Sequence, residues 1–167
     1  MLAQIKSDYP KDVRFIYRHF PLLRDGEGNL FHDKSGLAVQ AAESAGLQDK
    51  FWEMHDLIFE NQPLWAVLTP EEFDTWALEQ AAILELDVGQ FALDYASADI
   101  AQIAENSFLN GFEIGLQGTP TLMVDGDIIG SQFFAPEALN AILKHFLIPM
   151  GRMVEKQFSE CPEITID

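Results

Sequence analysis

The order of apolar and polar positions predicts a short helix, a strand, a long helical block, a hairpin and a last helix. Leu2 and Ile5 recur at helical spacing, and Pro10 ends this first helix. Over residues 13–20, the valine, a phenylalanine and the tyrosine fall on one face and both arginines on the other, as in a half-exposed edge strand. Residues 21–32 are rich in glycine and polar side chains, so we expect a loop there.

Almost continuous helix is predicted for residues 33–116. The strongest start signal is at Thr69, a preferred N-cap residue, because Pro70 suits the first helical position and Glu72 completes a capping box. The other helices of this block are predicted at residues 34–45 and 49–61, after Asp87 with Gln90 in the reciprocal position, and after Ser97.

A change of pattern follows this block. Two short β-prone runs, residues 121–124 and 127–130, are joined by an Asp-Gly pair, which is a strong hairpin signal. A Gly-Thr-Pro turn precedes the first run, and a last helix is expected from Pro136 to about residue 146. Residues 149–167 are less regular and are expected to form a tail or linker.

The charge excludes several classes of function. The chain has 167 residues, with 27 acidic against 10 basic side chains and a formal net charge of −17. A protein this acidic repels phosphate backbones and anionic headgroups, so we expect no nucleic-acid partner and no membrane-surface role. No apolar run approaches the roughly 18 residues of a spanning helix, so membrane insertion is not expected either.

The cysteines and histidines exclude further chemistry. Cys161 is the one cysteine, so the chain has no internal disulfide, no Cys-x-x-Cys pair and no four-cysteine zinc site. The four histidines lie far apart in sequence, without the close spacing of a helical metal site. We therefore expect no metal, no cofactor and no catalytic residue in this chain.

Three stretches of the sequence resemble the DsbA-like branch of the thioredoxin superfamily. They are residues 13–22, residues 41–62 with the run Phe-Trp-Glu-Met-His-Asp, and residues 115–121 with Gly-Thr-Pro-Thr. The resemblance implies an α/β, thioredoxin-like fold with a helical insertion. It places residues 1–32 and 116–148 in the thioredoxin-fold part and residues 33–115 in the inserted helical subdomain, with residues 149–167 as the tail.

The departure from this family concerns its chemistry. In the family, a first strand ends in a Cys-x-x-Cys motif, and the following helix N-terminus lowers the pKa of one thiol. That strand and motif are absent from this chain, and Cys161 lies beyond the last helix. We therefore expect a fragment of a larger thiol–disulfide oxidoreductase, inactive by itself; the alternative is a natural protein that has lost the site. The tail resembles the linker of proteins in which a cyclophilin-type domain follows.

The resemblance also implies a substrate site and partners. It identifies Gly118, Thr119 and Pro120 as the cis-proline loop, whose backbone pairs with an extended substrate peptide by strand addition. The partners would be polypeptides with thiols or disulfides, in an extracytoplasmic compartment, although the first residues lack the pattern of a signal peptide. A missing first strand leaves two sheet edges unpaired, so a strand-swapped dimer, or the tail at residues 163–166, is expected to fill the gap.

Two other functions stay open at this point. One is a redox-inactive module that keeps the peptide groove for binding, and the other is a glutathione-using enzyme of the same broad fold. Whether the parent is an oxidase, a reductase or an isomerase is also open, because the dipeptide between the cysteines is missing. Individual side chains are given ordinary structural roles. His55 is expected to bond to a backbone carbonyl, and Glu71, Glu72 and Asp74 to lie at a helix start. Phe51, Trp52, Leu57 and Ile58 are expected in the core of the helical subdomain; the alternative is an exposed apolar groove for unfolded clients beside the active site.

Overall fold

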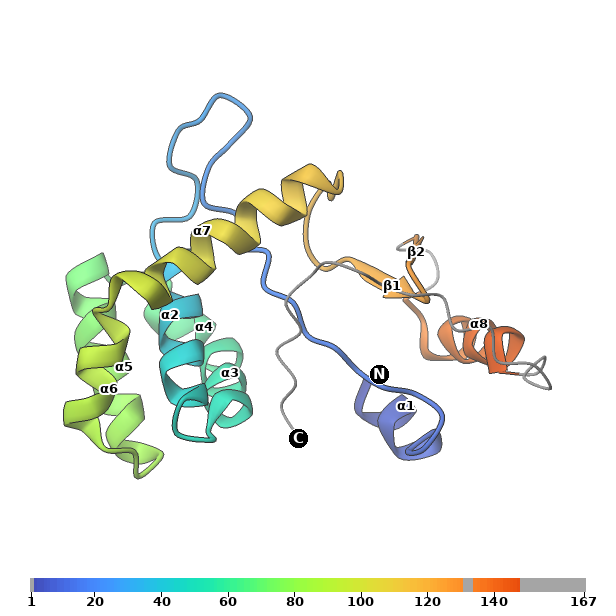
Figure 1. The fold of residues 1–167 in the computed structure, drawn as a ribbon, viewed down its shortest axis with the longest axis horizontal. Helices are drawn as coiled ribbons and strands as arrows, with labels where there is room; N and C mark the ends of the chain where they lie inside the picture. Colours follow the sequence, from blue (N-terminus) through green and yellow to red (C-terminus); the bar gives the residue numbers. More distant parts are fainter. Residues whose placement is uncertain (1, 131–133, 148–167) are drawn as a thin grey trace. The chain divides into compact units, whose positions relative to one another are not determined.

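The computed structural model describes residues 2–130 and 134–147 (Figure 1). The predicted tail at 149–167, with Cys161, lies outside the described residues. Two strands and eight helices are described in these ranges: α1 (Leu2–Asp8), α2 (Ser35–Gly46), α3 (Phe51–Glu60), α4 (Gln62–Trp65), α5 (Pro70–Ile83), α6 (Val88–Tyr95), α7 (Ala98–Glu113), β1 (Leu122–Val124), β2 (Asp127–Ile129) and α8 (Pro136–Leu147).

The chain divides by its contacts into two compact units. The described residues within 2–16 and 121–147 form the first, here called the hairpin unit, and residues 17–120 form the second, the helical unit. The sequence predicts the limits of the inserted helical subdomain at residues 33 and 115. This division by contacts does not test those limits, and they stay a prediction.

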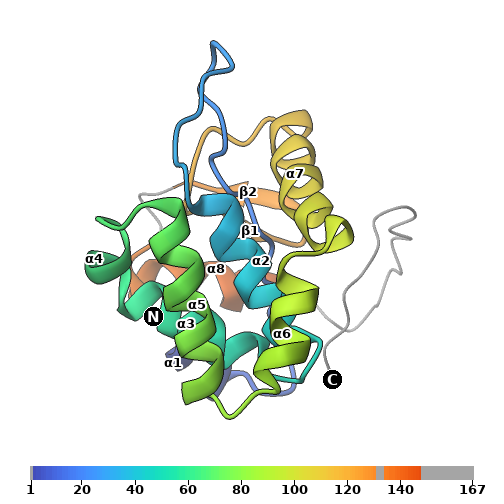
Figure 2. The same cartoon turned by 90° about the vertical axis from the view of Figure 1, so that its left-hand side faces the viewer.

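Helix α2 is the centre of the helical unit, since it packs against α3, α5, α6 and α7 (Figure 2). Its buried side chains are small: Ala41 and Ala45 are fully buried and Ala42 nearly so. Small side chains let neighbouring helix axes approach closely. The larger members of the core, Phe73 and Phe91, come from α5 and α6 and are also fully buried. The core therefore pairs a small-residue helix with large aromatic side chains from its neighbours.

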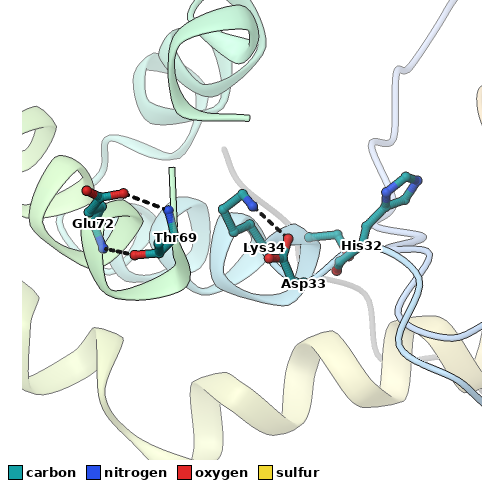
Figure 3. A network of polar contacts seen from close by, with 6 residues as sticks. His32, Asp33, Lys34, Thr69 and Glu72 are labelled. Atoms are coloured by element: carbon teal, nitrogen blue, oxygen red, sulfur yellow. Dashed lines mark hydrogen bonds and ion pairs between the residues drawn. The ribbon is translucent and has the colours of Figure 1, made fainter. Parts of the chain in front are cut away.

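The capping box predicted at the start of α5 is confirmed (Figure 3). The Thr69 backbone N–H donates to Glu72 Oε2 at 2.8 Å, and the Glu72 N–H donates to Thr69 Oγ1 at 3.2 Å. These bonds satisfy two backbone donors that a helix start would otherwise leave unpaired.

The reciprocal cap predicted at the start of α6 forms only in part. The Asp87 side chain caps the helix by accepting from the Gln90 N–H at 3.0 Å. The Gln90 side-chain oxygen does not accept the Asp87 N–H in return, and the Gln90 amide nitrogen donates to Asp94 at 3.0 Å. The Asp87 N–H finds a partner in Gln48 Oε1, at 2.8 Å, so this helix start is tied to the chain that follows α2.

The hairpin unit is built on a two-stranded antiparallel sheet. Strands β1 and β2 pair with Leu122 opposite Ile129. The joining residues Asp125 and Gly126 both have positive φ, at 49° and 91°, as the predicted Asp-Gly hairpin turn requires. Three buried side chains of α1 and α8, with partly buried ones from residues 9–15 and β1, form this unit's core: Ile5, Leu139 and Leu143, with Tyr9, Val13, Phe15, Leu122 and Val124.

The strand expected over residues 13–20 does not form in the described structure. Among the described residues, β1 pairs with β2 alone. The alternation of side chains holds for the first part of the segment, because Val13 and Phe15 are half-buried against the core while Arg14 and Ile16 are exposed. The pattern therefore identified the correct faces, but strand hydrogen bonds depend on a neighbour that the pattern does not specify.

A buried hydrogen bond joins α5 to α6 in the helical unit. The Tyr95 hydroxyl donates to Asp74 Oδ1 at 2.6 Å, and Tyr95 is 8% exposed. Burial, and then the bond to the Asp74 carboxylate, raise the pKa of Tyr95 above its ordinary value of 10.0. Asp74 therefore has a packing role besides any contribution to the start of α5.

We expect Tyr95→Phe to lower the free energy of unfolding by about 1–3 kcal/mol, because the Asp74 carboxylate loses a buried donor. Since the folded-state pKa of Tyr95 is raised, its contribution is complete below about pH 10 and is lost as the pH rises toward the folded value. Urea unfolding at pH 7 and above pH 10 measures both effects. Equal pH dependence of the two proteins above pH 10 would contradict the assignment.

Candidate functional site

The Gly118–Pro120 loop lies between the end of α7 and β1. Helix α7 ends at Glu113, and Gly115 follows it with a φ of 79°. The Gln117 side chain donates to the Gly115 carbonyl at 2.9 Å and closes this turn. The structure therefore leads the chain directly from the last helix of the helical unit into the loop.

The loop itself is open to solvent. The Thr119–Pro120 peptide bond is cis, which is the geometry that the family resemblance implies for Pro120. Both residues are exposed, and a Cβ placed on Gly118 would meet nothing within 4 Å. The Cβ position of Gly118 is therefore unobstructed, and the binding role of these residues stays a prediction.

A second feature, which the sequence did not reveal, is an aromatic cluster in the helical unit. It joins the segment before the first loop to α3, with Tyr17 at its centre. The Tyr17 ring lies 4.6 Å from His55, 5.8 Å from Trp52 and 5.9 Å from Phe51, measured between ring centroids. The cluster consists of Tyr17, His19, Phe51, Trp52, His55 and Phe59.

A hydrogen-bond contact joins His19 of this cluster to α2. The His19 Nε2 lies 2.8 Å from Glu43 Oε1 on α2, with side chains only 10% and 13% exposed. Burial, and then the nearby Glu43 carboxylate, raise the pKa of Tyr17 above its ordinary value. A carboxylate thus lies between α2 and the segment at residues 17–19, and holds that segment against the helices.

His55 differs from the expectation of a bond to a backbone carbonyl. Its Nδ1 lies 2.9 Å from Asp56 Oδ1, and its buried Nε2 has no hydrogen-bond partner within the described residues. The reason is that α3 carries an acidic neighbour directly after the histidine. No cysteine or serine contact to this imidazole is described, so the cluster lacks a nucleophile for His55 to activate.

The expected core side chains of α3 divide between two faces. Phe51 and Ile58 are buried and belong to the core of the helical unit, as predicted. Trp52 is 43% exposed, and this contradicts its assignment to the core. The apolar residues of α3 are too many for one face of the helix, so some of them must lie in solvent.

The first loop is held to α7 beside Gly111. The Arg24 guanidinium makes two bonds to the Glu105 carboxylate, at 2.8 and 3.0 Å. Gly111 is needed for the approach of Phe20, because a Cβ at this position would lie 2.3 Å from the Phe20 ring. The Phe20 ring also stacks on Phe108, with 6.3 Å between centroids. This packing positions the C-terminal half of α7, from which the Gly118–Pro120 loop follows.

Gly111→Ala is expected to destabilise the protein by about 1–3 kcal/mol, because the added methyl group must displace the Phe20 ring. Gly26→Ala is the matched control, since nothing lies within 4 Å of a Cβ there and its φ is not in the left-handed region. Thermal unfolding of both variants gives the comparison. The account is wrong if the two variants unfold at the same temperature.

The described ranges contain neither a metal-binding group of side chains nor a membrane-spanning helix. No group of three or more His, Cys, Asp or Glu side chains there could hold a metal ion. None of the helices in this part of the chain is both long and apolar enough to cross a bilayer.

Comparison with known proteins gives a family. A family model described as thioredoxin matches residues 1–145. The chain belongs to the thioredoxin family, and the helices with a small two-stranded sheet form a thioredoxin-like domain. No solved structure matches this chain significantly.

The curated relatives are much longer proteins. The chain is 35% identical over 127 residues to Na(+)/H(+) antiporter NhaA 1 of Salinispora arenicola, covering 75% of this chain and 17% of that protein. It is 34% identical over 129 residues to Na(+)/H(+) antiporter NhaA 3 of Salinispora tropica, with the same two shares. Against Na(+)/H(+) antiporter NhaA 1 of Mycolicibacterium vanbaalenii the identity is 30% over 127 residues, 75% of this chain and 18% of the relative. The chain therefore spans less than a fifth of these relatives.

Proposed function

We propose that this chain is the greater part of a DsbA-like thiol–disulfide oxidoreductase domain. In this proposal residues 33–115 are the inserted helical subdomain, and a strand that ends in Cys-x-x-Cys precedes residue 1. The observation that carries it is the exposed Gly118–Pro120 loop, in a chain of the thioredoxin family, directly before β1. The block of helices between residues 20 and 116 supports the assignment to this branch.

The chemistry belongs to the two cysteines that the proposal places ahead of this chain. The first cysteine thiolate attacks a substrate disulfide and forms a mixed disulfide, while one substrate sulfur leaves as a thiolate. The second cysteine thiolate then attacks the mixed disulfide and releases the other substrate sulfur. The substrate is reduced by two electrons and the cysteine pair is oxidised; the reverse sequence oxidises a substrate dithiol.

The residues of this chain supply the substrate position. The Thr119 backbone offers an N–H and a carbonyl to an extended peptide. The peptide pairs with these two groups in the manner of an added β-strand. Gly118 leaves room for the peptide backbone, and Thr119 would border the reacting cysteines. The proposed partners are accordingly polypeptides with thiols or disulfides in an extracytoplasmic compartment. A second copy that supplies a swapped strand remains a candidate assembly.

A second candidate is a redox-inactive interaction module. The described residues contain no cysteine, and this favours binding without thiol exchange for the chain itself. In the relatives, the segment similar to this chain is part of a longer protein named an Na(+)/H(+) antiporter. In this second function the loop would hold a segment of the same or a neighbouring polypeptide.

We expect Thr119→Arg to weaken binding of an extended, uncharged peptide with an S-methylated cysteine by about tenfold or more, because the long side chain blocks the peptide's path. Thr75→Arg, at an exposed position of α5, is the matched control and should change the affinity less than about twofold. Fluorescence anisotropy of the labelled peptide gives the dissociation constants.

Equal affinities of the Thr119→Arg and Thr75→Arg variants for the peptide would contradict the proposed substrate site. A parallel assay of insulin reduction separates the two candidates. The chain by itself should show no activity, and a longer gene product with the proposed cysteines should be active under the oxidoreductase proposal and inactive under the second one.

A further inference from the structure

The exposed part of the aromatic cluster is not used by the proposed function. Tyr17, Trp52 and Phe59 are 38%, 43% and 58% exposed, and together they are here called the aromatic face. Their rings surround His55, at centroid distances of 4.6, 5.3 and 4.7 Å. Exposed rings that gather around one side chain form a clustered apolar surface, and such clusters mark sites of interaction more often than scattered apolar residues do.

A carboxylate lies within this surface. Trp52, Asp56 and Phe59 follow one another at i, i+4 and i+7 along α3, so they share one side of the helix. The Asp56 side chain is 68% exposed, and its one described contact is with His55 Nδ1. Trp52 and Phe59 therefore flank an accessible carboxylate on the same side of α3.

The part of the face that lies on α3 is acidic, whereas Arg18 directly follows Tyr17. Helix α3 has no lysine or arginine, while Glu53 and Glu60 add to the charge of Asp56. Lys50, directly before the helix, is engaged with Glu53 at 2.9 Å. This combination of exposed rings and an accessible carboxylate, which contacts His55, is complementary to a cation that carries apolar neighbours.

We propose that the aromatic face binds a basic amphipathic segment of a partner polypeptide. An arginine or lysine of the segment pairs with Asp56 and lies over a neighbouring ring, while apolar side chains of the segment pack on Trp52 and Phe59. The net charge of −17 disfavours the other occupants, because nucleic acids, anionic membranes and a second copy of this chain are all negative. The aromatic face shares no residue with the Gly118–Pro120 loop, and the two bind peptides of different chemistry.

The test uses a short labelled peptide of alternating leucine and arginine, titrated with the full chain by fluorescence anisotropy. We expect Asp56→Asn to weaken binding about fivefold, from the loss of an exposed ion pair. We expect Phe59→Ala to weaken it about tenfold, from the loss of an exposed ring contact. In NMR spectra, the indole N–H signal of Trp52, assigned with Trp52→Phe, should shift more than those of Trp65 and Trp76.

Two matched controls are available. Glu79→Gln removes an exposed carboxylate from α5, and Phe112→Ala removes an exposed ring, 69% accessible, from α7. Both should bind the peptide within about twofold of the unchanged protein. Circular dichroism checks that each variant is folded. If Phe59→Ala does not fold, the comparison of Asp56→Asn with Glu79→Gln still tests the proposal.

Several outcomes would overturn the proposal. No binding of the peptide is the first, and equal binding of a peptide with glutamate in place of arginine is the second. Equal weakening by Asp56→Asn and Glu79→Gln would mean that only the overall charge attracts the peptide. Sedimentation that shows a dimer, dissociated by Phe59→Ala, would assign the face to a second copy of the chain instead.

Discussion

The helical unit depends on the close packing that the small side chains of α2 allow. Four helices surround α2, and each must approach it over Ala41, Ala42, Ala45 or their neighbours. Larger side chains at these positions would push the helix axes apart. The large aromatic residues of the core, Phe73 and Phe91, fill the space that the alanines leave. The packing of α2 and α3 also fixes where the outer side of α3 carries its aromatic face.

The same packing holds the start of the helical unit in place. Glu43 on α2 pairs with His19, and Phe51 of α3 contacts both His19 and Tyr17. At the other end of the unit, Gly111 admits Phe20 against α7. Residues 17–20 are thus held by contacts at both α2–α3 and α7. The loop that follows α7 therefore begins from a helix packed on two sides.

Local signals in the sequence were enough to locate most elements. The caps at Thr69, Asp87 and Ser97 each act through a side chain that bonds a nearby backbone N–H, so a window of a few residues contains all the information. The Asp-Gly turn is local in the same sense. The strand at 13–20 failed because strand formation needs a partner elsewhere in the chain or outside it. Trp52 was assigned to the wrong side of its helix because the apolar residues of α3 do not form a single stripe.

The two features of the candidate region also differ in how far the sequence predicts them. The Gly118–Pro120 loop was found from a short motif and a family resemblance. An exposed apolar groove on α3 was an alternative that the sequence offered, but the contact of residues 17–19 with residues 51–59 has no signal in either segment alone. The central claim is that this domain works with two cysteines supplied from ahead of residue 1. Sequencing the DNA immediately upstream of the Met1 codon tests it most directly. The account predicts an in-frame apolar strand that ends in Cys-x-x-Cys. A stop codon, or an upstream sequence without that motif, would contradict it.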